Sequence, residues 1–429
     1  MRIVLITDVF PPLRSSGAVQ LRDLSREFAS LGNDVTVMVA SPELTVAWQL
    51  DRMDDIRVLR LRAPKTKDRN YFQRTLGEFA MPFAMLRNLK ASPCASEVWD
   101  AVVWYSPTIF LGPLVKALKI RSRCPSYLII RDIFPEWAVD MGLMGRGLPY
   151  QFFRSVARYQ YSVADVIGVQ TPGNLSYFSK GTSNEKPRLE VLHNWLADSS
   201  DIGCSIDVAN GLFKGRRIFV YAGNMGIAQG MGILLDLAEH LKARTDIGFI
   251  FVGRGSDAQR LRETARLREL DNVAFYDEID PDEIPGLYKQ CHVGLVALDP
   301  RHKTHNIPGK FLSYMQSSLP VLACINEGND LVELIEEAAV GKTCTDNNVS
   351  TLSRLALELL SQIDDDKKIR ERCKALAESM FSPATAVKTI ISAVDYERKS
   401  IYATDAKSSV FHGSAVAEDE AAPEYSPKL

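Results

Sequence analysis

The sequence predicts an α/β protein of two doubly wound domains, each with a parallel sheet covered by helices on both faces. Short runs rich in Val and Ile recur along the chain, and stretches of helical length separate them. Many of these runs are apolar on both faces, as in Arg-Ile-Phe-Val-Tyr-Ala at 217–222, which is typical of strands buried between two helix layers. Alternating strands and helices indicate βαβ units. Because the series runs twice, we expect two Rossmann-like domains that face each other across a cleft.

The expected strands fall into two groups. The first comprises 2–8, 34–41, 56–62, 101–106, 126–132, 166–171 and 189–193, and the second comprises 217–223, 247–253, 273–277, 292–298 and 319–325. Between them, 198–215 is polar and rich in small residues, as a linker would be. We therefore expect a first domain at 1–200 and a second at 201–380. A helix at 381–400 should pack back on the first domain, and the aperiodic remainder at 401–429 should be disordered.

The composition excludes several classes of protein. The chain has 429 residues, 46% of them hydrophobic, and 51 basic against 53 acidic residues give a net charge of −2. Such a chain is neither a disordered protein nor a dedicated nucleic-acid binder. The seven cysteines show no CxxC spacing, so we expect small buried thiols in a reducing cytoplasm rather than a disulfide framework or a zinc ribbon. No apolar run reaches the length of a membrane span, and the N-terminus is typical of a strand rather than a signal peptide.

A glycine-rich segment at 223–232 (Gly-Asn-Met-Gly-Ile-Ala-Gln-Gly-Met-Gly) follows an expected strand and leads into an expected helix. Glycines let backbone N–H groups approach a phosphate, and a helix N-terminus adds a partial positive charge. We therefore expect an anion site, although a tight strand–helix turn would use the same residues. Gly253-Arg254-Gly255 is a second, weaker loop of this kind.

Two further segments carry charged candidates. In 305–315, Lys310 falls in the first turn of an expected helix and can place a cation beside an anion held at the helix end; an exposed loop lysine is the alternative. Asp132 and Glu136 follow an apolar strand, and the carboxyl edge of a parallel sheet faces the ligand crevice. Capping of a helix by Asp132 is an equally good explanation.

Other kinds of site lack their sequence patterns. The first strand leads to Phe10-Pro11-Pro12 rather than GxGxxG, and Gly341-Lys342-Thr343 lacks the leading glycine of a Walker loop. Asp280-Pro281-Asp282 has the spacing of a metal-binding DxD pair, but a helix start with Asp280 as N-cap explains it better. Asp330 and Glu333 have the spacing of a capping box. With no tight cluster of metal ligands and no hydrolase triad, we expect no metal.

Residues 56–90 carry a local positive charge. Nine basic side chains stand against Asp68 and Glu78, a local sum of +7. The interleaved aromatic residues are Tyr71, Phe72, Phe79 and Phe83. A solvated basic face over core aromatics is the default explanation. The alternative is binding to an anionic membrane surface, because cations are attracted to such a leaflet and aromatic rings settle at its interface.

Together these segments resemble bacterial glycosyltransferases of family 4, which have the GT-B fold, and the resemblance covers almost all of 1–398. Phe10-Pro11-Pro12 with Gly17 is similar to the donor-side glycine loop of that family. Arg-Asp-Ile-Phe-Pro-Glu at 131–136 is similar to the RDLWPE segment of its O-antigen and capsule enzymes, and His193-Asn194-Trp195 resembles the crossover between domains. Among these enzymes the chain most resembles N-acetyl-L-fucosamine transferases.

The resemblance implies a retaining glycosyltransferase that moves a sugar, with N-acetyl-L-fucosamine as the candidate, from a UDP-linked donor to a lipid-linked saccharide. The product would belong to O-antigen, capsule or exopolysaccharide. The protein would be cytoplasmic and peripheral on the inner face of the cell membrane, with no cofactor and no nucleic-acid partner. The catalytic candidates are Asp132, Glu136 and Lys310. The candidate donor-binding residues are Gly17, Gly223, Asn224, Gly226, Gln229, Gly230, Arg254, Asn306, Pro308, Gly309 and Ser313.

The chain departs from the family pattern at four positions. Asn224 and Gln229 stand where most members carry an Arg and a Lys that grip the diphosphate. His305 and Ser313 stand where members carry two glutamates, the second of which holds the nucleotide ribose. These departures leave two alternatives open: a UDP-sugar 2-epimerase-like enzyme of the same fold, and a catalytically silent partner subunit.

Overall fold

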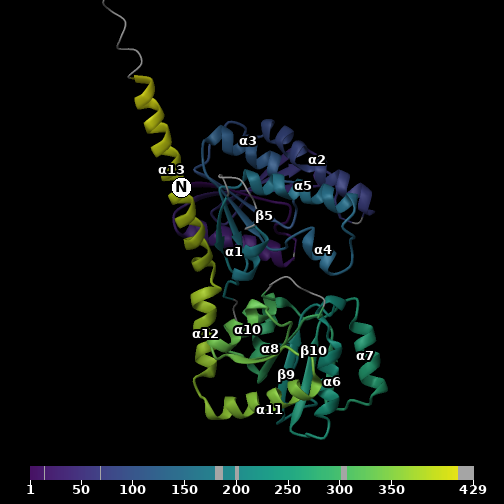
Figure 1. The fold of residues 1–429 in the computed structure, drawn as a ribbon. Coiled ribbons are helices and arrows are strands. Elements are labelled where there is room, and N and C mark those ends of the chain that lie inside the picture. The colour runs from purple at the N-terminus through teal and green to yellow at the C-terminus, as the bar shows by residue number, and fades with distance from the viewer. Residues whose placement is uncertain (14, 68, 179–186, 199–201, 301–306, 414–429) are drawn as a thin grey trace, which may run out of the picture.

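The structure, a computed structural model, describes residues 1–13, 15–67, 69–178, 187–198, 202–300 and 307–413, with side chains to residue 401. The chain forms two α/β domains, which lie one above the other in Figure 1. Strands of the first domain are β1 (Arg2–Thr7), β2 (Asp34–Ser41), β3 (Trp48–Met53), β4 (Ile56–Arg62), β5 (Ala101–Ser106), β6 (Ser126–Ile130), β7 (Val166–Val169) and β8 (Arg188–Val191). Its helices are α1 (Ser16–Ser30), α2 (Tyr71–Lys90), α3 (Gly112–Ser122), α4 (Glu136–Asp140), α5 (Leu148–Val163) and the 3-10 helix η1 (Pro172–Tyr177).

The second domain follows the same plan. Its strands are β9 (Arg217–Ala222), β10 (Ile247–Val252), β11 (Val273–Tyr276), β12 (Val293–Ala297), β13 (Val321–Cys324) and β14 (Gly341–Cys344). Its helices are η2 (Ile227–Gln229), α6 (Gly232–His240), α7 (Ala258–Leu267), η3 (Pro281–Glu283), α8 (Ile284–Lys289), α9 (Gly309–Gln316), α10 (Asp330–Glu337), α11 (Val349–Asp365) and α12 (Ile369–Met380). The last helix, α13 (Pro383–Gly413), returns to the first domain.

Both sheets wind in two directions from their first strand. Within the described residues, the first sheet has eight strands in the order β3-β4-β2-β1-β5-β6-β7-β8, and the second has six in the order β11-β10-β9-β12-β13-β14. All neighbouring strands are parallel except β3, which forms an antiparallel hairpin with β4. The strand order reverses between β1 and β5 and between β9 and β12, and these are the switch points of the two sheets. The expected pair of doubly wound parallel-sheet domains is confirmed.

Side chains alternate between the two faces of each sheet, as the period of a strand requires. In β1, Ile3 and Leu5 pack in the core under α1 and α13, whereas Val4 and Ile6 pack under α2 and α3. The second sheet is covered in the same way, by α8, α9, α10 and α12 on one face and by α6, α7 and α11 on the other. The apolar runs therefore became strands because both of their faces are buried.

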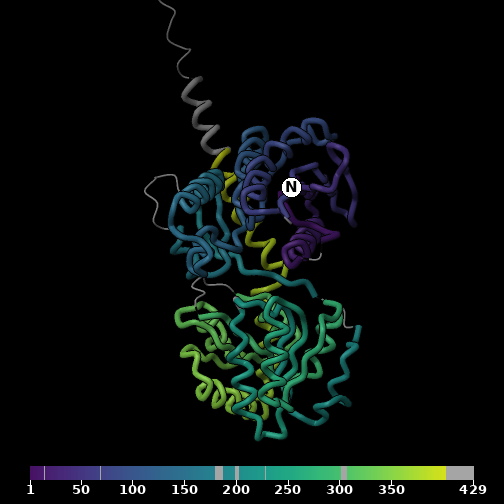
Figure 2. Tube along the Cα trace, turned by 90° about the vertical axis from the view of Figure 1, so that its right-hand side faces the viewer, coloured from purple at the N-terminus to yellow at the C-terminus, as the bar shows by residue number. Residues whose placement is uncertain are grey.

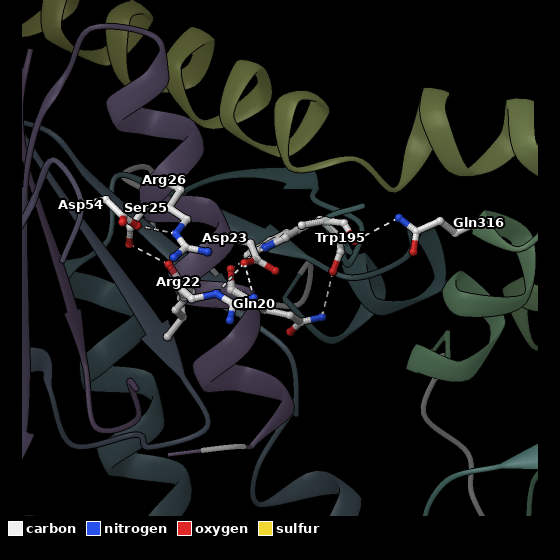
Figure 3. A network of polar contacts seen from close by, with 10 residues as sticks. Gln20, Arg22, Asp23, Ser25, Arg26, Asp54, Trp195 and Gln316 are labelled. Atoms are coloured by element: carbon white, nitrogen blue, oxygen red, sulfur yellow. Dashed lines mark hydrogen bonds and ion pairs between the residues drawn. The ribbon is translucent and has the colours of Figure 1, made fainter. Parts of the chain in front are cut away.

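The chain crosses between the domains twice, and the two crossings touch. The first crossing, 192–198, meets the second at the start of α13, where the Leu196 N–H donates to the Phe381 carbonyl at 2.9 Å. Trp195 is fully buried; its Nε1 donates to the Gln20 carbonyl at 2.7 Å, and the Gln20 Nε2 donates back to the Trp195 carbonyl at 3.3 Å (Figure 3). From the second domain, the Gln316 Nε2 donates to the Ala197 carbonyl at 3.0 Å. The crossing is thus bonded to α1 on one side and to α9 on the other.

Helix α13 completes the core of the first domain. Val387, Ile390 and Val394 are buried against α1 and the first sheet, and Figure 2 shows this yellow segment lying along the first domain. The helix continues to Gly413, whereas we expected order to end at residue 400. Ala and Lys in 401–407 favour helix. Residues 414–429 lie outside the described residues.

Three sequence-based expectations differ from the fold. The strands β3 and β14 were not anticipated. The linker expected at 198–215 is wrong for its second half, because Ile206, Val208 and Phe213 are buried in the core of the second domain. These apolar residues are spaced among Gly, Ser and Asn, and the local polarity concealed them.

Candidate functional site

The carboxyl edges of the two sheets face each other. Gln170 follows β7, and its Nε2 donates to the carbonyl of Ile307, which precedes α9, at 3.0 Å. The Gly173 N–H donates to Oδ2 of Asp330, at the start of α10, at 2.8 Å. Loops that follow strands of both sheets therefore meet. Ligands of open α/β sheets bind in the crevice at this edge, so the candidate site lies between the two switch points.

On the second domain, the glycine-rich loop after β9 packs against the loop after β10. The Met225 N–H donates to the Arg254 carbonyl at 2.8 Å. Gly253 has a φ of +135°, and a Cβ there would lie 2.1 Å from the Gly223 carbonyl oxygen, so only glycine permits the contact. Gly230 has a φ of +58°, and its added Cβ would lie 3.0 Å from the Cα of Asp299. The tight-turn alternative thus explains Gly230, and the contact between the two loops explains Gly253. Gly223 and Asn224 remain exposed at the edge.

Lys310 places a positive charge at the carboxyl edge of the second sheet. It stands in the first turn of α9, where no side chain caps the helix and no acidic residue occurs. Its Nζ donates to Oε1 of Gln229 at 3.1 Å and lies 4.6 Å from the centre of the Tyr221 ring. Burial lowers the pKa of Lys310 to about 8. Lys310 is half-buried against the glycine loop, so the alternative of an exposed loop lysine is wrong.

The other predicted donor-binding residues of the second domain divide into four groups. Gln229 touches Lys310, and Gly226 caps η2 beside Asn224. Pro308 and Gly309 begin α9, and Ser313 bonds back to the Gly309 carbonyl at 3.4 Å. Arg254 points to solvent and pairs with Glu278 at 2.8 Å, with its side chain 82% exposed. Asn306 and His305 lie outside the described residues.

On the first domain, the predicted acids lie at the carboxyl edge, as expected, on the opposite side from Lys310. Asp132 follows β6 and is exposed. The N-cap of α4 is Pro135, so the explanation of Asp132 as a helix cap is wrong. Glu136 begins α4, and the Tyr150 hydroxyl donates to its Oε1 at 3.5 Å. Gly17 lets the start of α1 approach the neighbouring strand, since a Cβ would lie 3.2 Å from the Tyr105 hydroxyl.

Arg131 has a structural role that the sequence did not reveal. Its guanidinium donates to the Leu192 carbonyl at 2.9 Å and lies 4.6 Å from the centre of the Trp195 ring. Burial lowers the pKa of Arg131 to about 10. The residue before Asp132 thus fixes the crossing between the domains, and this explains part of the motif at 131–136.

Asp8, directly after β1, was also missed. The residue is half-buried, and its Oδ1 is shielded from solvent with no hydrogen-bond partner among the described residues. Desolvation raises the pKa of the Asp8 carboxyl to about 6, against the opposing effects of its own backbone N–H, Lys67 and Arg74, and the charge of Glu78 raises it further. The argument that selected Asp132, an acid at the carboxyl end of a strand, applies equally to Asp8 and would have found it.

The metal-like and capping motifs have structural explanations. Asp280 caps η3, with its Oδ1 accepting from the Asp282 N–H at 3.1 Å, so the predicted cap is confirmed. The predicted cap at Asp330 is wrong by one residue, because Asn329 caps α10 and Asp330 instead contacts Gly173. In the described ranges, no group of three or more His, Cys, Asp or Glu is placed to hold a metal ion.

The aromatic residues of α2 do not enter the core. Phe72, Leu76, Phe79 and Phe83 form one stripe along the helix, and each is at least half exposed. The expectation that the aromatics of this segment belong to the core is wrong. Three basic side chains of the segment 56–90 form ion pairs: Arg57 pairs with Glu97, Arg60 with Asp51 and Arg74 with Glu78. No helix of the described residues has the length and hydropathy needed to cross a bilayer.

Comparison with known protein families gives a match that lies within the second domain. Residues 205–378 match the family of glycosyl transferases group 1. This match covers the glycine-rich loop, Lys310 and all strands of the second sheet. The second domain is therefore similar to the glycosyl transferases group 1 family, over less than half of the whole chain.

Two relatives extend the likeness into a larger part of the chain. A Pseudomonas aeruginosa protein named as glycosyltransferase WbjE is 24% identical over 237 residues, which are 54% of this chain and 59% of that protein. The Escherichia coli K12 protein WcaI, named as a colanic acid biosynthesis glycosyl transferase, is 24% identical over 297 residues, or 62% of this chain and 69% of its own. The match to WbjE spans less than two thirds of that relative's length.

Solved structures confirm the fold. Sucrose-phosphate synthase from Thermosynechococcus elongatus superposes with a TM-score of 0.67 at 13% identity, covering 94% of this chain and 99% of that one. WaaG, a glycosyltransferase involved in lipopolysaccharide biosynthesis, superposes with a TM-score of 0.61 at 16% identity over 90% of this chain and 99% of its own. The expected GT-B fold, with two facing α/β domains, is confirmed.

Replacing Asp8 with Asn should stabilise the protein above pH 6 by about 1–3 kcal/mol. The pKa of Asp8 is about 6 in the folded protein against an ordinary value of 3.8, so the folded chain binds this proton more tightly than the unfolded chain. The wild type therefore loses stability as the pH rises through this interval, whereas the variant does not. Calorimetric melting temperatures should show a difference that grows from about pH 4 to about pH 6 and is then constant. A difference independent of pH would contradict the burial of this charge.

Proposed function

We propose that the chain is a retaining glycosyltransferase that moves a sugar from a nucleotide diphosphate donor to a lipid-linked saccharide in the biosynthesis of a cell-surface polysaccharide. The observation that carries the proposal is the half-buried Lys310 ammonium, which stands between the first turn of α9 and the glycine-rich loop at an edge facing a second domain. The match of 205–378 to glycosyl transferases group 1 and the names of WbjE, WcaI and WaaG support the reaction class and the polysaccharide context.

In the proposed reaction, the bond between C1 of the sugar and the diphosphate breaks, and a bond from C1 to an acceptor oxygen forms. Negative charge develops on the departing phosphate, where Lys310 and the N–H groups of the first turn of α9 stabilise it. The acceptor oxygen attacks C1 on the face from which the phosphate departs, and its proton passes to that phosphate, so neither a protein nucleophile nor a protein base is required. Asp132 and Glu136, on the other domain, orient the acceptor or the donor sugar.

The donor is proposed to be UDP-linked, with N-acetyl-L-fucosamine as the candidate sugar. One solved neighbour, an Escherichia coli protein of trehalose-6-phosphate metabolism, is described as bound with UDP-2-fluoro glucose (TM-score 0.65, 10% identity). In this chain, Gln229 stands where the family pattern has a second cation, and its Oε1 accepts a hydrogen bond from the Lys310 ammonium. The donor grip is therefore expected to depend strongly on Lys310.

The acceptor is proposed to reach the site from a membrane that the first domain touches. The ring centre of Phe79, in the stripe on α2, lies 6.4 Å from that of Phe110. The ring centre of Phe110 in turn lies 6.5 Å from that of Phe153 on α5. Arg87 and Lys90 lie in the last turn of α2. An exposed aromatic stripe beside cations suits the interface of an anionic bilayer.

A thermal-shift screen tests the donor assignment. UDP, GDP and dTDP and their sugars are added in turn, and a ligand that binds the folded state raises the melting temperature. We expect uridine nucleotides to give the largest shift. If no nucleotide changes the melting temperature, the chain is a silent partner subunit. If UDP-sugar is epimerised without any acceptor, the 2-epimerase alternative is correct.

Replacing Lys310 with Ala should reduce turnover at least about tenfold, because the departing phosphate loses its cation. The assay uses a labelled donor chosen by the thermal-shift screen and membranes from a strain of the source organism that lacks the gene, and it counts label in the lipid fraction. Lys374→Ala is the control, since that side chain is 64% exposed on α12. Unchanged turnover in Lys310→Ala would remove Lys310 from the mechanism.

Replacing Phe72 and Phe83 together with Ser should weaken sedimentation with phosphatidylglycerol-containing vesicles severalfold, because two exposed rings no longer enter the interface. Both side chains are at least half exposed, so the fold should persist. Leu267→Ser is the matched control, since Leu267 is 67% exposed but lies on α7 of the second domain. Equal sedimentation of the wild type and the double variant at low salt would show that this face does not bind the bilayer.

A further inference from the structure

The switch point of the first sheet holds a carboxylate that the proposed mechanism does not use. Asp8 directly follows β1, and the neighbouring strand across the switch point is β5, which carries Tyr105. The charges of Asp132 and Asp8 both raise the pKa of Tyr105, so the three groups share one environment. In the second sheet the loop after β9 and the helix after β12 flank the corresponding switch point, and Lys310 stands there. Asp8 and Lys310 therefore each lie near the switch point of one of the two facing sheets.

The Asp8 carboxyl has an unused capacity to accept hydrogen bonds. Its Oδ1 is shielded from solvent and accepts no hydrogen bond from any described residue. A buried acceptor without a donor destabilises the folded chain, and such groups are rare in native structures. They persist where function requires them, because functional sites are often kept at a cost in stability. Because Asp8 lies at the carboxyl edge that faces the other domain, a ligand bound there can supply the missing donor.

The surroundings of Asp8 indicate the chemistry of that donor. Lys67 and Arg74 already supply positive charge to the Asp8 carboxyl, so a cationic ligand is disfavoured. An anionic ligand would be repelled by Asp8 itself and by Glu78. A neutral group that donates a hydrogen bond fits both conditions, and a saccharide hydroxyl is such a group.

We propose that Asp8 binds the acceptor: its Oδ1 accepts a hydrogen bond from a hydroxyl of the saccharide that receives the transferred sugar. The inference rests on the proposed function and names a residue of its acceptor side. Asp8 holds the acceptor against the first sheet, opposite the donor held at Lys310. Loss of this bond should reduce transfer without weakening the binding of the donor diphosphate, because Lys310 on the other domain holds that diphosphate in the proposed reaction.

The test compares Asp8→Ala, Asp8→Asn and Asp100→Asn. Asp100 precedes β5 at the opposite edge of the same sheet, and its carboxylate accepts from the Arg2 N–H at 2.7 Å, a bond that Asn can keep. Transfer is measured with the labelled donor and the gene-deleted membranes described for Lys310, at several membrane concentrations. Donor binding is measured separately, as the shift in melting temperature with the same donor.

For Asp8→Ala we expect at least a tenfold loss of transfer at low membrane concentration, partly recovered at high concentration. Asp8→Asn retains an oxygen that can accept and should lose less, and Asp100→Asn should transfer as the wild type does. Both Asp8 variants should melt no lower than the wild type at pH 7.5 and keep the full donor-induced shift, which a merely structural role of Asp8 would not produce.

Two results would overturn the inference while the proposed function stands: wild-type transfer by Asp8→Ala, or a lost donor-induced shift in that variant. If the wild type itself transfers no label and binds no nucleotide sugar, the proposed function fails instead. These outcomes differ in whether the wild type is active, so the two failures are distinguishable.

Discussion

The buried guanidinium of Arg131 determines where the two sheets meet. It directly follows β6 of the first sheet and bonds to the carbonyl of Leu192, where the chain leaves that sheet, while its face stacks on Trp195. Burying a cation is costly unless carbonyl oxygens and an aromatic face replace water. Because Leu192 and Trp195 both belong to the crossing, this path of the crossing stabilises the buried charge. The opposition of the two carboxyl edges, and with it the position of the site, depends on that contact.

Charge is divided between the two sides of the site. The second domain presents Lys310 and the open first turn of α9, and the first presents Asp8, Asp132 and Glu136. In the proposed reaction, the donor diphosphate is attracted to one side, and the neutral hydroxyls of the acceptor sugar find hydrogen-bond acceptors on the other. The net charge of −2 for the whole chain conceals this division, because it averages over both sides and over many exposed ion pairs.

Much of the architecture could be predicted from the sequence, because strands buried on both faces must be apolar throughout and their boundaries are then visible. The strands that were missed lack this property. In β14, Lys342 and Thr343 are only partly buried, and β3 is a half-exposed hairpin strand in which polar residues are as frequent as apolar ones. The glycine-rich loop and Lys310 were predicted because their chemistry is local in the sequence. Asp8 and Arg131 were not, since the burial that perturbs their pKa values is produced by segments far away in the chain.

The return of α13 to the first domain makes the second domain an insertion within the first. Val387 and Ile390 fill a core whose other walls are α1 and the first sheet, so contacts that complete this core join the two ends of the chain. During synthesis, the first domain must wait with an exposed apolar face until the last helix leaves the ribosome, while the second domain can already fold. Chains that stop before residue 383 should therefore contain a folded second domain and an incomplete first one, which exposes an apolar surface to chaperones and proteases.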